Sequence, residues 1–355
     1  MAALHHLTPS HTFLCLCLVV ITLLLADFVG ANHGDKKEPT FWIAGYLPDY
    51  RFYIDVNETV PFLTDLILFS ASTNDDSLTT CCLTKDHFQI ARQARAYKEQ
   101  HLEDVGTGTP LKLWLTVGGG GRSNHFLDRV GGTSLEEAIQ SLAIENGFDG
   151  VDMDCEQITS QNDYLNYLSW IRRVAPRFKD AGLEVSVALH AGQFLYQDMY
   201  QSIDRVNLMA YDMPGGYHAS LQSVHRAVER LIGSGCPANK IVLGIPAYAR
   251  HTQQPGNVKT FAELMDEVQK INPSSPEKVP IDDFVQWKGF LVEGPKAVRE
   301  KVSFARDQNL GGVFLWELGQ DKQTTKAKGG ILLEAAATGI KYREEEGDGG
   351  DDNEL

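Results

Sequence analysis

Eight short apolar runs, each bounded by turn residues, recur along the chain and constrain its fold more than any other feature. Most are separated by segments with helical periodicity. Near-continuous apolar strands joined by helices indicate a parallel sheet covered on its outer face. Eight such units predict a single closed (β/α)8 TIM barrel of the α/β class. An open, doubly wound sheet is the alternative, but no dinucleotide-binding fingerprint follows the first run. The runs are 41–46, 65–70, 111–117, 148–156, 183–190, 206–211, 241–248 and 313–317.

Three carboxyl side chains share one face of the fourth run, Phe148–Glu156. Successive side chains of a strand point to opposite faces, so Asp152, Asp154 and Glu156 lie on one side, with neighbours roughly 6–7 Å apart. The opposite side is apolar, which favours a central strand over an edge strand with a solvated acidic face. Because like charges repel, we expect at least one of these carboxyls to hold its proton near neutral pH.

Polar residues also end two other runs. Tyr211-Asp212 ends the sixth run and Trp316-Glu317 ends the eighth. In barrels of this kind, chemistry takes place at the carboxyl ends of the strands. We therefore expect these side chains to meet the acidic row at the mouth of the barrel.

The segments between the runs predict helices. The periodic segments lie at about 86–100, 133–147, 163–179, 221–232 and 296–308. Thr133-x-x-Glu136 has the pattern of a capping box for the second of them. Between the seventh and eighth runs, Thr260–Ile271 predicts one helix, followed by a turn rich in Pro and Ser.

Five stretches, in this order along the chain, resemble motifs of family 18 glycoside hydrolases, the chitinases and their relatives. The resemblance covers about residues 41–340 and is strongest in the acidic run, which is similar to D-G-x-D-x-D-x-E. Two positions depart from the family pattern: Thr116 replaces a usual Ser, and Cys155 replaces a common Trp but points away from the substrate. The five stretches are Thr116–Gly119, Asp149–Glu156, Met209–Asp212, Gly244–Arg250 and Gly311–Asp321.

The resemblance implies four catalytic residues. Glu156 would protonate the glycosidic oxygen and later act as the base for the incoming water. Asp154 would orient the substrate's acetamido group, whose own oxygen attacks the anomeric carbon in this family. Asp152 would share a proton with Asp154, and Tyr211 would donate its hydroxyl to the acetamido oxygen. We expect the charges of Asp152 and Asp154 to raise the pKa of Glu156.

The same resemblance implies a set of substrate-binding residues. Trp316 would form an apolar floor under the sugar at the cleavage point, with Met209 beside it, and Asp212 would bind sugar hydroxyls. Asp149 has the wrong parity to face the substrate, so we assign it a structural role. The binding set is Tyr46, Gly118, Gly119, Met209, Asp212 and Trp316.

The expected substrate is chitin or its oligosaccharides, polymers of β-1,4-linked N-acetylglucosamine. The stretch 251–310 is too short for a full chitinase insertion domain, so we expect a shallow, open groove and endo cleavage. Two alternatives are an endo-β-N-acetylglucosaminidase acting on the N-glycan core and a carbohydrate-binding, lectin-like relative without catalysis. The retained Glu156 favours an enzyme.

The termini predict a secreted protein. An apolar run at 13–26, followed by small residues up to Ala31, indicates a signal peptide over 1–31, with a signal anchor as the alternative. The catalytic domain is expected at 38–342, followed by an acidic disordered tail at 343–355. The final Asp352-Asn353-Glu354-Leu355 resembles an ER retention signal, so a retention receptor and the ER lumen are alternatives. Asn57 lies in a glycosylation sequon.

Charge and cysteine spacing narrow the possible partners. A formal net charge of −15 argues against binding to a nucleic-acid backbone. We expect no metal, no cofactor and no stable membrane association after signal cleavage. Cys81, Cys82, Cys155 and Cys236 lack the paired spacing of a zinc site. Adjacent Cys81 and Cys82 cannot easily bond to each other, and the disulfide pairing is not readable from the sequence. A thiol nucleophile at Cys155 would lack a histidine nearby in the sequence.

Overall fold

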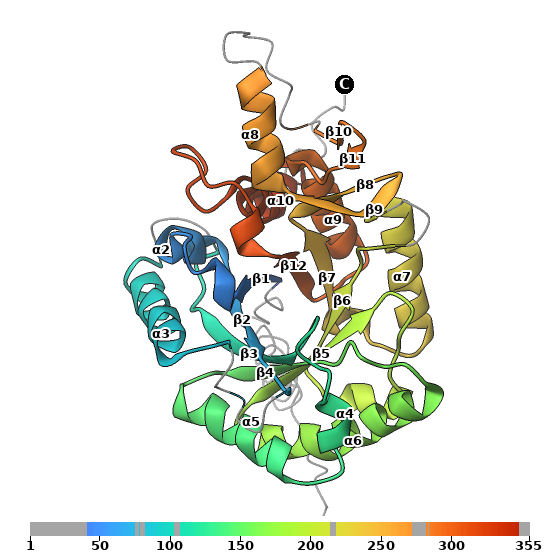
Figure 1. Ribbon diagram of the computed structural model, residues 1–355. Coiled ribbons are helices and arrows are strands. Elements are labelled where there is room, and N and C mark those ends of the chain that lie inside the picture. Colours follow the sequence, from blue (N-terminus) through green and yellow to red (C-terminus); the bar gives the residue numbers. More distant parts are fainter. Residues whose placement is uncertain are drawn as a thin grey trace, which may run out of the picture. The chain divides into compact units, whose positions relative to one another are not determined.

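Eight parallel strands close into a barrel in the computed structural model (Figure 1). The order around the barrel is β1-β12-β7-β6-β5-β4-β3-β2, so the predicted closed barrel is confirmed and the open sheet is excluded. The strands are β1 (Trp42–Pro48), β2 (Asp65–Ala71), β3 (Lys112–Gly118), β4 (Gly150–Asp154), β5 (Glu184–His190), β6 (Arg205–Met209), β7 (Ile241–Pro246) and β12 (Gly312–Trp316).

The structure describes residues 41–74, 78, 82–102, 107–213, 218–271, 282 and 284–347. The predicted signal peptide, Cys81 and the retention motif lie outside these residues. The last described helix, α10 (Ile331–Gly347), includes residues 343–347, where the predicted tail begins.

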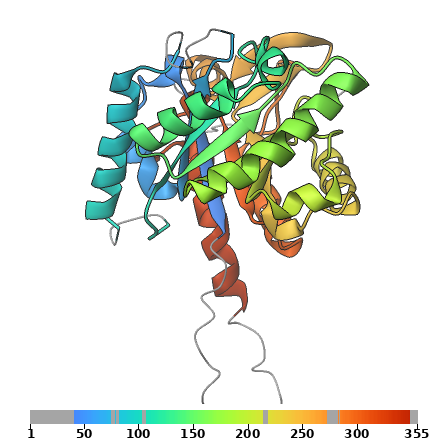
Figure 2. The same cartoon turned by 90° about the horizontal axis from the view of Figure 1, so that it is seen from below.

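Helices cover the outside of the barrel, and Figure 2 shows α5 and α6 lying over the strands. No helix in the described part of the chain is long and apolar enough to cross a lipid bilayer. The main covering helices are α3 (Lys85–Gln100), α5 (Ser134–Glu145), α6 (Gln161–Asp180), α7 (Leu221–Gly233) and α9 (Pro295–Asp307). The short ones are α2 (Val56–Thr59), α4 (Phe126–Arg129) and 3-10 turns at Asp49–Arg51, Val60–Phe62, Gln197–Gln201, Ala238–Lys240 and Leu318–Gln320.

The predicted capping box at the start of α5 is wrong. Thr133 makes no side-chain capping hydrogen bond. Glu136 is 2% exposed and lies 3.6 Å from Arg173 and 3.8 Å from Arg177, both on α6. The carboxylate therefore pairs with the neighbouring helix, because two guanidinium groups offer it a stronger partner than one backbone N–H.

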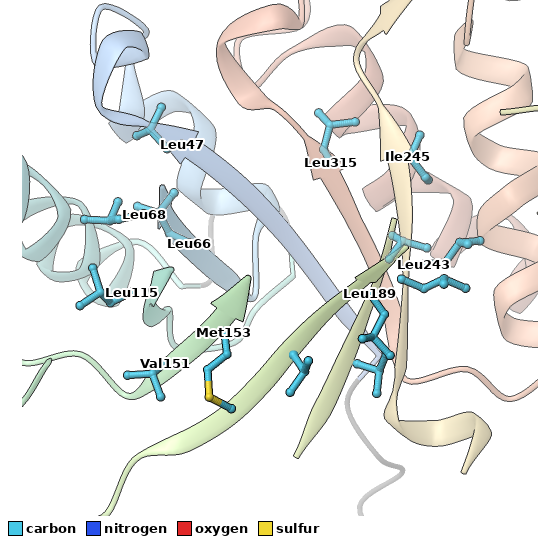
Figure 3. Packing of buried hydrophobic residues seen from close by; sticks show 14 of the residues in the cluster. Leu47, Leu66, Leu68, Leu115, Val151, Met153, Leu189, Leu243, Ile245 and Leu315 are labelled. Atoms are coloured by element: carbon cyan, nitrogen blue, oxygen red, sulfur yellow. The ribbon is translucent and has the colours of Figure 1, made fainter. Parts of the chain in front are cut away.

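The core lies between the strands and the helices, as Figure 3 shows for part of the cluster. Val151 and Met153 of β4 belong to it, and Cys155 follows them on the same side. The apolar face predicted for the acidic run is therefore packed against helices. This fixes the register of β4, because a shift by one residue would bury its carboxyls in the core instead.

A buried charge cluster fills the amino-terminal end of the barrel. Arg205, the first residue of β6, lies between the rings of Trp42 and Trp114, at 4.0 and 4.3 Å from their centroids. Its guanidinium pairs with Asp65 at 2.8 Å and with Glu184 at 3.3 Å. The flat guanidinium stacks on the two rings while its edge meets the carboxylates, which closes this end of the barrel.

A small antiparallel sheet is inserted between β7 and β12. It consists of β8 (Tyr248–His251), β9 (Gln254–Thr260), β10 (Gln286–Trp287) and β11 (Phe290–Leu291), in the order β10-β11-β8-β9. Helix α8 (Phe261–Ile271) confirms the predicted helix. The strands were not predicted, because β9 is mostly exposed and two strands are only two residues long.

We predict that Arg205→Met lowers the free energy of unfolding by about 3–5 kcal/mol, because it leaves Asp65 buried without its cation. Urea denaturation followed by circular dichroism measures the change. The matched control is Arg172→Met, which removes an exposed ion pair with Asp198 and should change stability by less than about 1 kcal/mol. Equal effects of the two substitutions would contradict the structural role of the cluster.

Candidate active site

The acidic row lies at the mouth of the barrel. Asp152 and Asp154 are inside β4 and are 0% and 3% exposed, and Glu156 follows two residues after the strand ends. Two of the three carboxyls are therefore largely shielded from water. A buried carboxyl must be protonated or be surrounded by donors.

Asp152 is surrounded by donors. Its Oδ2 accepts hydrogen bonds from the Tyr46 hydroxyl (2.8 Å) and from Thr116 Oγ1 (3.1 Å). Its Oδ1 accepts from Ser186 Oγ (2.6 Å) and from Asn207 Nδ2 (3.0 Å). Burial raises the pKa of Asp152 above its ordinary value, although all four hydrogen bonds act in the opposite direction. Four donors fit the ionised form, since a carboxylate has only acceptors.

Asp154 is not surrounded in this way. Its Oδ1 is buried and has no hydrogen-bond partner among the described residues. Burial, and then the negative charges of Glu156 and Asp152, raise its pKa well above the ordinary value. Asp154 therefore has a strong tendency to hold a proton. The described residues show no hydrogen bond between Asp154 and Asp152, so the predicted proton sharing between them stays a prediction.

Glu156 lies between the loop after β3 and the end of β5. Its carboxyl oxygens lie 3.6 and 3.7 Å from where a Cβ on Gly120 would be. On the other side, Oε2 lies 3.9 Å from Nε2 of His190. Burial is the main cause that raises the pKa of Glu156, while His190 and a hydrogen bond from the Gly120 backbone lower it. We had expected the charges of Asp152 and Asp154 to raise this pKa; burial is the larger cause, and the repulsion between Glu156 and Asp154 raises the pKa of Asp154 as well.

Asp154 and Glu156 border a cavity of about 220 Å³, and Asp152 accepts a hydrogen bond from Tyr46, which lines the same cavity. Trp316 forms part of its wall and packs edge-on against Tyr46 and Phe69, at centroid distances of 5.3 and 4.7 Å. The cavity is lined by Tyr46, Tyr50, Phe69, Gly120, Asp154, Glu156, Ala188, His190, Met209, Tyr211, Asp212, Tyr248 and Trp316. The structure thus brings together the predicted Tyr46, Met209, Tyr211, Asp212 and Trp316.

Gly118 and Gly119, predicted to contact substrate, are not among the lining residues. A Cβ on Gly118 would lie 2.2 Å from the backbone oxygen of Asp154, at φ +93°. A Cβ on Gly119 would lie 2.3 Å from the ring of Phe69. These glycines therefore allow the loop to approach β4 and β2 closely, and Gly120 is the glycine that faces the cavity.

Asp212 is held by three side chains from outside β6. Its carboxylate accepts from the Tyr248 hydroxyl at 2.7 Å and from Arg250 Nη2 at 2.5 Å, and lies 3.3 Å from Nδ1 of His218. Burial would raise its pKa, but the hydrogen bonds from His218, Arg250 and Tyr248 lower it well below the usual range. Asp212 is therefore a fixed negative charge in the cavity wall.

Tyr211, next to Asp212, keeps its hydroxyl proton. Burial, then the charges of Tyr248, Asp154 and Glu156, raise its pKa well above the usual value. Asp149 lies away from the cavity, accepting hydrogen bonds from Arg95 (2.5 Å) and the backbone of Leu113 (2.7 Å). These contacts agree with the structural role expected for Asp149.

The donors around Asp152 and the residues around Asp212 were missed by sequence reasoning. Ser186 and Asn207 are polar residues within apolar strands, and the register places Ser186 beside Asp152. A polar residue that interrupts an apolar strand indicates a buried polar partner, so the sequence held a signal for these two donors. His190, His218 and Arg250 carried no such signal, because each lies in a different loop or strand from the acid that it faces.

The cysteines do not take part in this site. Cys155 and Cys236 are free and buried, and burial raises the pKa of each thiol to about 12. A thiol nucleophile at Cys155 is thereby excluded. Cys82 is disulfide-bonded. No group of three or more His, Cys, Asp or Glu side chains in the described ranges could hold a metal ion.

A buried ion pair holds the loop after β1 against the end of β12. Glu317, which is 1% exposed, accepts from Arg51 Nε at 2.8 Å and from the Gly319 backbone at 2.8 Å. Arg51 also lies over the ring of Tyr50, which lines the cavity. Burial raises the pKa of Glu317 to about 7, although Arg51 and the Gly319 N–H lower it.

This pKa predicts a pH-dependent stability. A carboxyl with a raised pKa in the folded state stabilises the fold below its unfolded pKa of about 4.3, and this contribution is lost as the pH rises through about 7. The free energy of unfolding of wild type minus that of Glu317→Gln should therefore fall by about 1–3 kcal/mol between pH 4.5 and 7.5. Urea denaturation at each pH measures the difference.

The control is Glu229→Gln, at an exposed position on α7, for which the difference from wild type should stay flat with pH. A flat difference for Glu317→Gln would show that Glu317 has the same pKa in both states.

Comparisons with known proteins agree with this geometry. A family model described as glycosyl hydrolases family 18 matches residues 43–321. Endochitinase 1 of Metarhizium robertsii is 26% identical over 266 residues, which are 60% of this chain and 62% of that protein. The chain thus spans less than two thirds of the length of this relative. Human chitinase-3-like protein 2 is 23% identical over 333 residues, 75% of this chain and 82% of that protein.

Solved structures share the fold. The GH18 chitinase from the chitin utilization locus of Flavobacterium johnsoniae superposes with a TM-score of 0.68 at 20% identity, covering 86% of this chain and 96% of its own. A chitinase from Bacteroides thetaiotaomicron gives a TM-score of 0.70 at 16% identity, covering 89% and 99%. A GH18 chitinase from Cycas revoluta, solved in complex with (GlcNAc)3, gives 0.67 at 19% identity, covering 84% and 99%.

Proposed function

The chain belongs to family 18 of the glycosyl hydrolases, and from this premise we propose that it hydrolyses chitin and chitooligosaccharides. One observation carries the proposal: Asp154 and Glu156 border the same cavity as Tyr211 and Trp316, and Asp152 is hydrogen-bonded to Tyr46 in the wall of that cavity. The names of its relatives, which include endochitinases of Metarhizium, support the substrate class.

Glu156 is the acid of the proposed reaction. A glycosidic oxygen leaves poorly unless it is protonated, so its acid must retain a proton near neutral pH. The raised pKa of Glu156, caused mainly by burial, supports this role. Glu156 gives its proton to the glycosidic oxygen as the bond from that oxygen to the anomeric carbon breaks.

The nucleophile of the proposed reaction comes from the substrate. The acetamido carbonyl oxygen forms a bond to the anomeric carbon, which gives a cyclic oxazolinium-type intermediate. The Glu156 carboxylate then takes a proton from water, and the water oxygen attacks the same carbon. The ring opens and the configuration is retained. Such an internal nucleophile has a large effective molarity if it is positioned well.

Asp154 and Tyr211 would position the acetamido group. The Asp154 Oδ1, buried and without a partner among the described residues, can accept the acetamido N–H. The Tyr211 hydroxyl, whose pKa is raised by burial, can donate to the acetamido oxygen. Trp316 offers an apolar face for the sugar ring. This set restricts the proposed substrates to N-acetylated sugars.

We further propose endo cleavage in a shallow groove, because the insertion between β7 and β12 is short. Apart from α9, which covers the barrel, the described residues there form four strands of two to seven residues and the 11-residue helix α8. An endo-β-N-acetylglucosaminidase of the N-glycan core is the second candidate, since it would need the same acid and the same acetamido group.

The central prediction concerns Glu156→Gln. The variant should cleave chitohexaose about 10²–10⁴-fold more slowly than wild type, because the amide cannot donate the required proton. Chromatography of the products measures the rate. Early release of mixed internal fragments would support endo cleavage, and stepwise release from one end would contradict it. A high-mannose glycopeptide and fully deacetylated oligomers complete the substrate panel.

The matched control is Glu145→Gln, at an exposed position at the end of α5, which should cleave like wild type. Equal rates for wild type and Glu156→Gln would contradict the mechanism. Cleavage of the glycopeptide alone would favour the second candidate. Binding of chitohexaose without any cleavage would favour a lectin-like protein.

We also propose that the protein enters the secretory pathway. Asn57 is exposed on α2, where a glycan could be attached, and Cys82 is disulfide-bonded, as is common in oxidising compartments. Protein from eukaryotic cells should lose mass on treatment with peptide N-glycosidase, and Asn57→Gln should not. An unglycosylated wild-type protein would contradict the proposal. Its recovery from the medium or from the ER distinguishes secretion from retention.

A further inference from the structure

Strand β5 brings a histidine to Glu156. His190 is the last residue of β5 and lines the cavity, with Nε2 at 3.9 Å from Glu156 Oε2. We propose that His190 is a positioning residue of the reaction, which as an imidazolium stabilises the Glu156 carboxylate and so sets the pH range in which Glu156 acts. The inference rests on the function proposed above.

The backbone holds His190 in place. Its N–H donates to Gln193 Oε1 at 2.9 Å, and its carbonyl accepts from the Gln193 N–H, also at 2.9 Å. These two bonds fix the turn that follows β5. The ring itself makes no hydrogen bond with any other described residue, and half of the side chain is exposed. The imidazole therefore faces Glu156 while part of it is open to solvent.

The other groups around Glu156 supply no second cation. Asp154 from β4 and Asp212 beyond β6 are acids, and Gly120 from the loop after β3 offers only a backbone N–H. Arg250 is the cation nearest to Asp212 and is bound to that carboxylate. In the described ranges, His190 is the one basic side chain within 4.0 Å of Glu156.

The position of a cation here has opposite effects on the two steps. The first step needs protonated Glu156, and an imidazolium at 3.9 Å lowers the pH at which that proton is lost. The second step needs the carboxylate, which the imidazolium stabilises. His190 thus moves the working range of Glu156 to lower pH, and the effect fades when the imidazole loses its charge.

The experiment compares wild type with His190→Asn and His190→Lys. The alkaline limb of the profile of kcat/KM against pH, measured on chitohexaose, should move to higher pH by about 0.5–1 pH unit in His190→Asn. The shift is smaller than a fully buried pair would give, because solvent screens a half-exposed pair. The limb should stay near the wild-type position in His190→Lys, whose charge is retained. In wild type, but not in His190→Asn, the limb should move up with added salt, which screens the interaction.

The control is His125→Asn, another exposed histidine, which pairs with Asp128 and does not line the cavity. Its alkaline limb should coincide with that of wild type. An unchanged limb in His190→Asn would overturn the proposal. A loss of rate that is uniform over pH would also overturn it, because it would show that His190 only contacts the sugar.

A second readout does not depend on turnover. NMR titration of carboxyl-labelled protein measures the pKa of the Glu156 carboxyl, and the Glu156→Gln variant assigns its signal. This pKa should be higher in His190→Asn than in wild type, by the same amount as the shift of the alkaline limb of the kcat/KM profile. If wild type cleaves no substrate, the proposed function fails, while this titration still decides the role of His190. Equal Glu156 pKa values in the two proteins would overturn it.

Discussion

A single carboxylate inside the barrel imposes the main constraint on this structure. Asp152 of β4 is out of contact with water and accepts hydrogen bonds from Tyr46, Thr116, Ser186 and Asn207. These donors belong to β1, β3, β5 and β6. Removing a charge from water is very unfavourable unless donors replace the water. The strands must therefore close at the right register for the charge to be tolerated, so the closure of the barrel and the chemistry of its mouth depend on each other.

The environment separates three similar side chains along one strand. Asp152 has four donors, Asp154 has an oxygen without a partner, and Glu156 is only partly covered. Asp152 lies within the donor network, Asp154 lies outside it, and Glu156 is also partly exposed. Each carboxyl therefore has a different tendency to hold a proton. The same chemical group can thus serve as a fixed charge, a protonated neighbour and a proton donor.

Sequence reasoning reached the barrel and the acidic row because both depend on local patterns. Apolar runs recur eight times, with helical periodicity between most of them, and alternation in β4 correctly separated Asp152 and Asp154 from Val151 and Met153. Sequence reasoning identified the like charges near Glu156 but not burial, the larger cause of its raised pKa, since burial depends on the closed barrel. The partners of Asp212 could not be predicted from the sequence either, because His218 and Arg250 come from other segments of the chain. The pairing of Glu136 with α6 likewise depends on how two helices pack.

The attachment of the small sheet to the barrel has a consequence for protein engineering. β8 begins only two residues after β7 ends, and Arg250 of β8 binds the carboxylate of Asp212 in the cavity wall. Tyr248, at the start of the same strand, binds that carboxylate as well. The sheet is therefore not an independent module that can be exchanged between homologous barrels at will. A chimera would have to take its graft boundary after Arg250, so that the recipient keeps both side chains and only the outer strands are replaced.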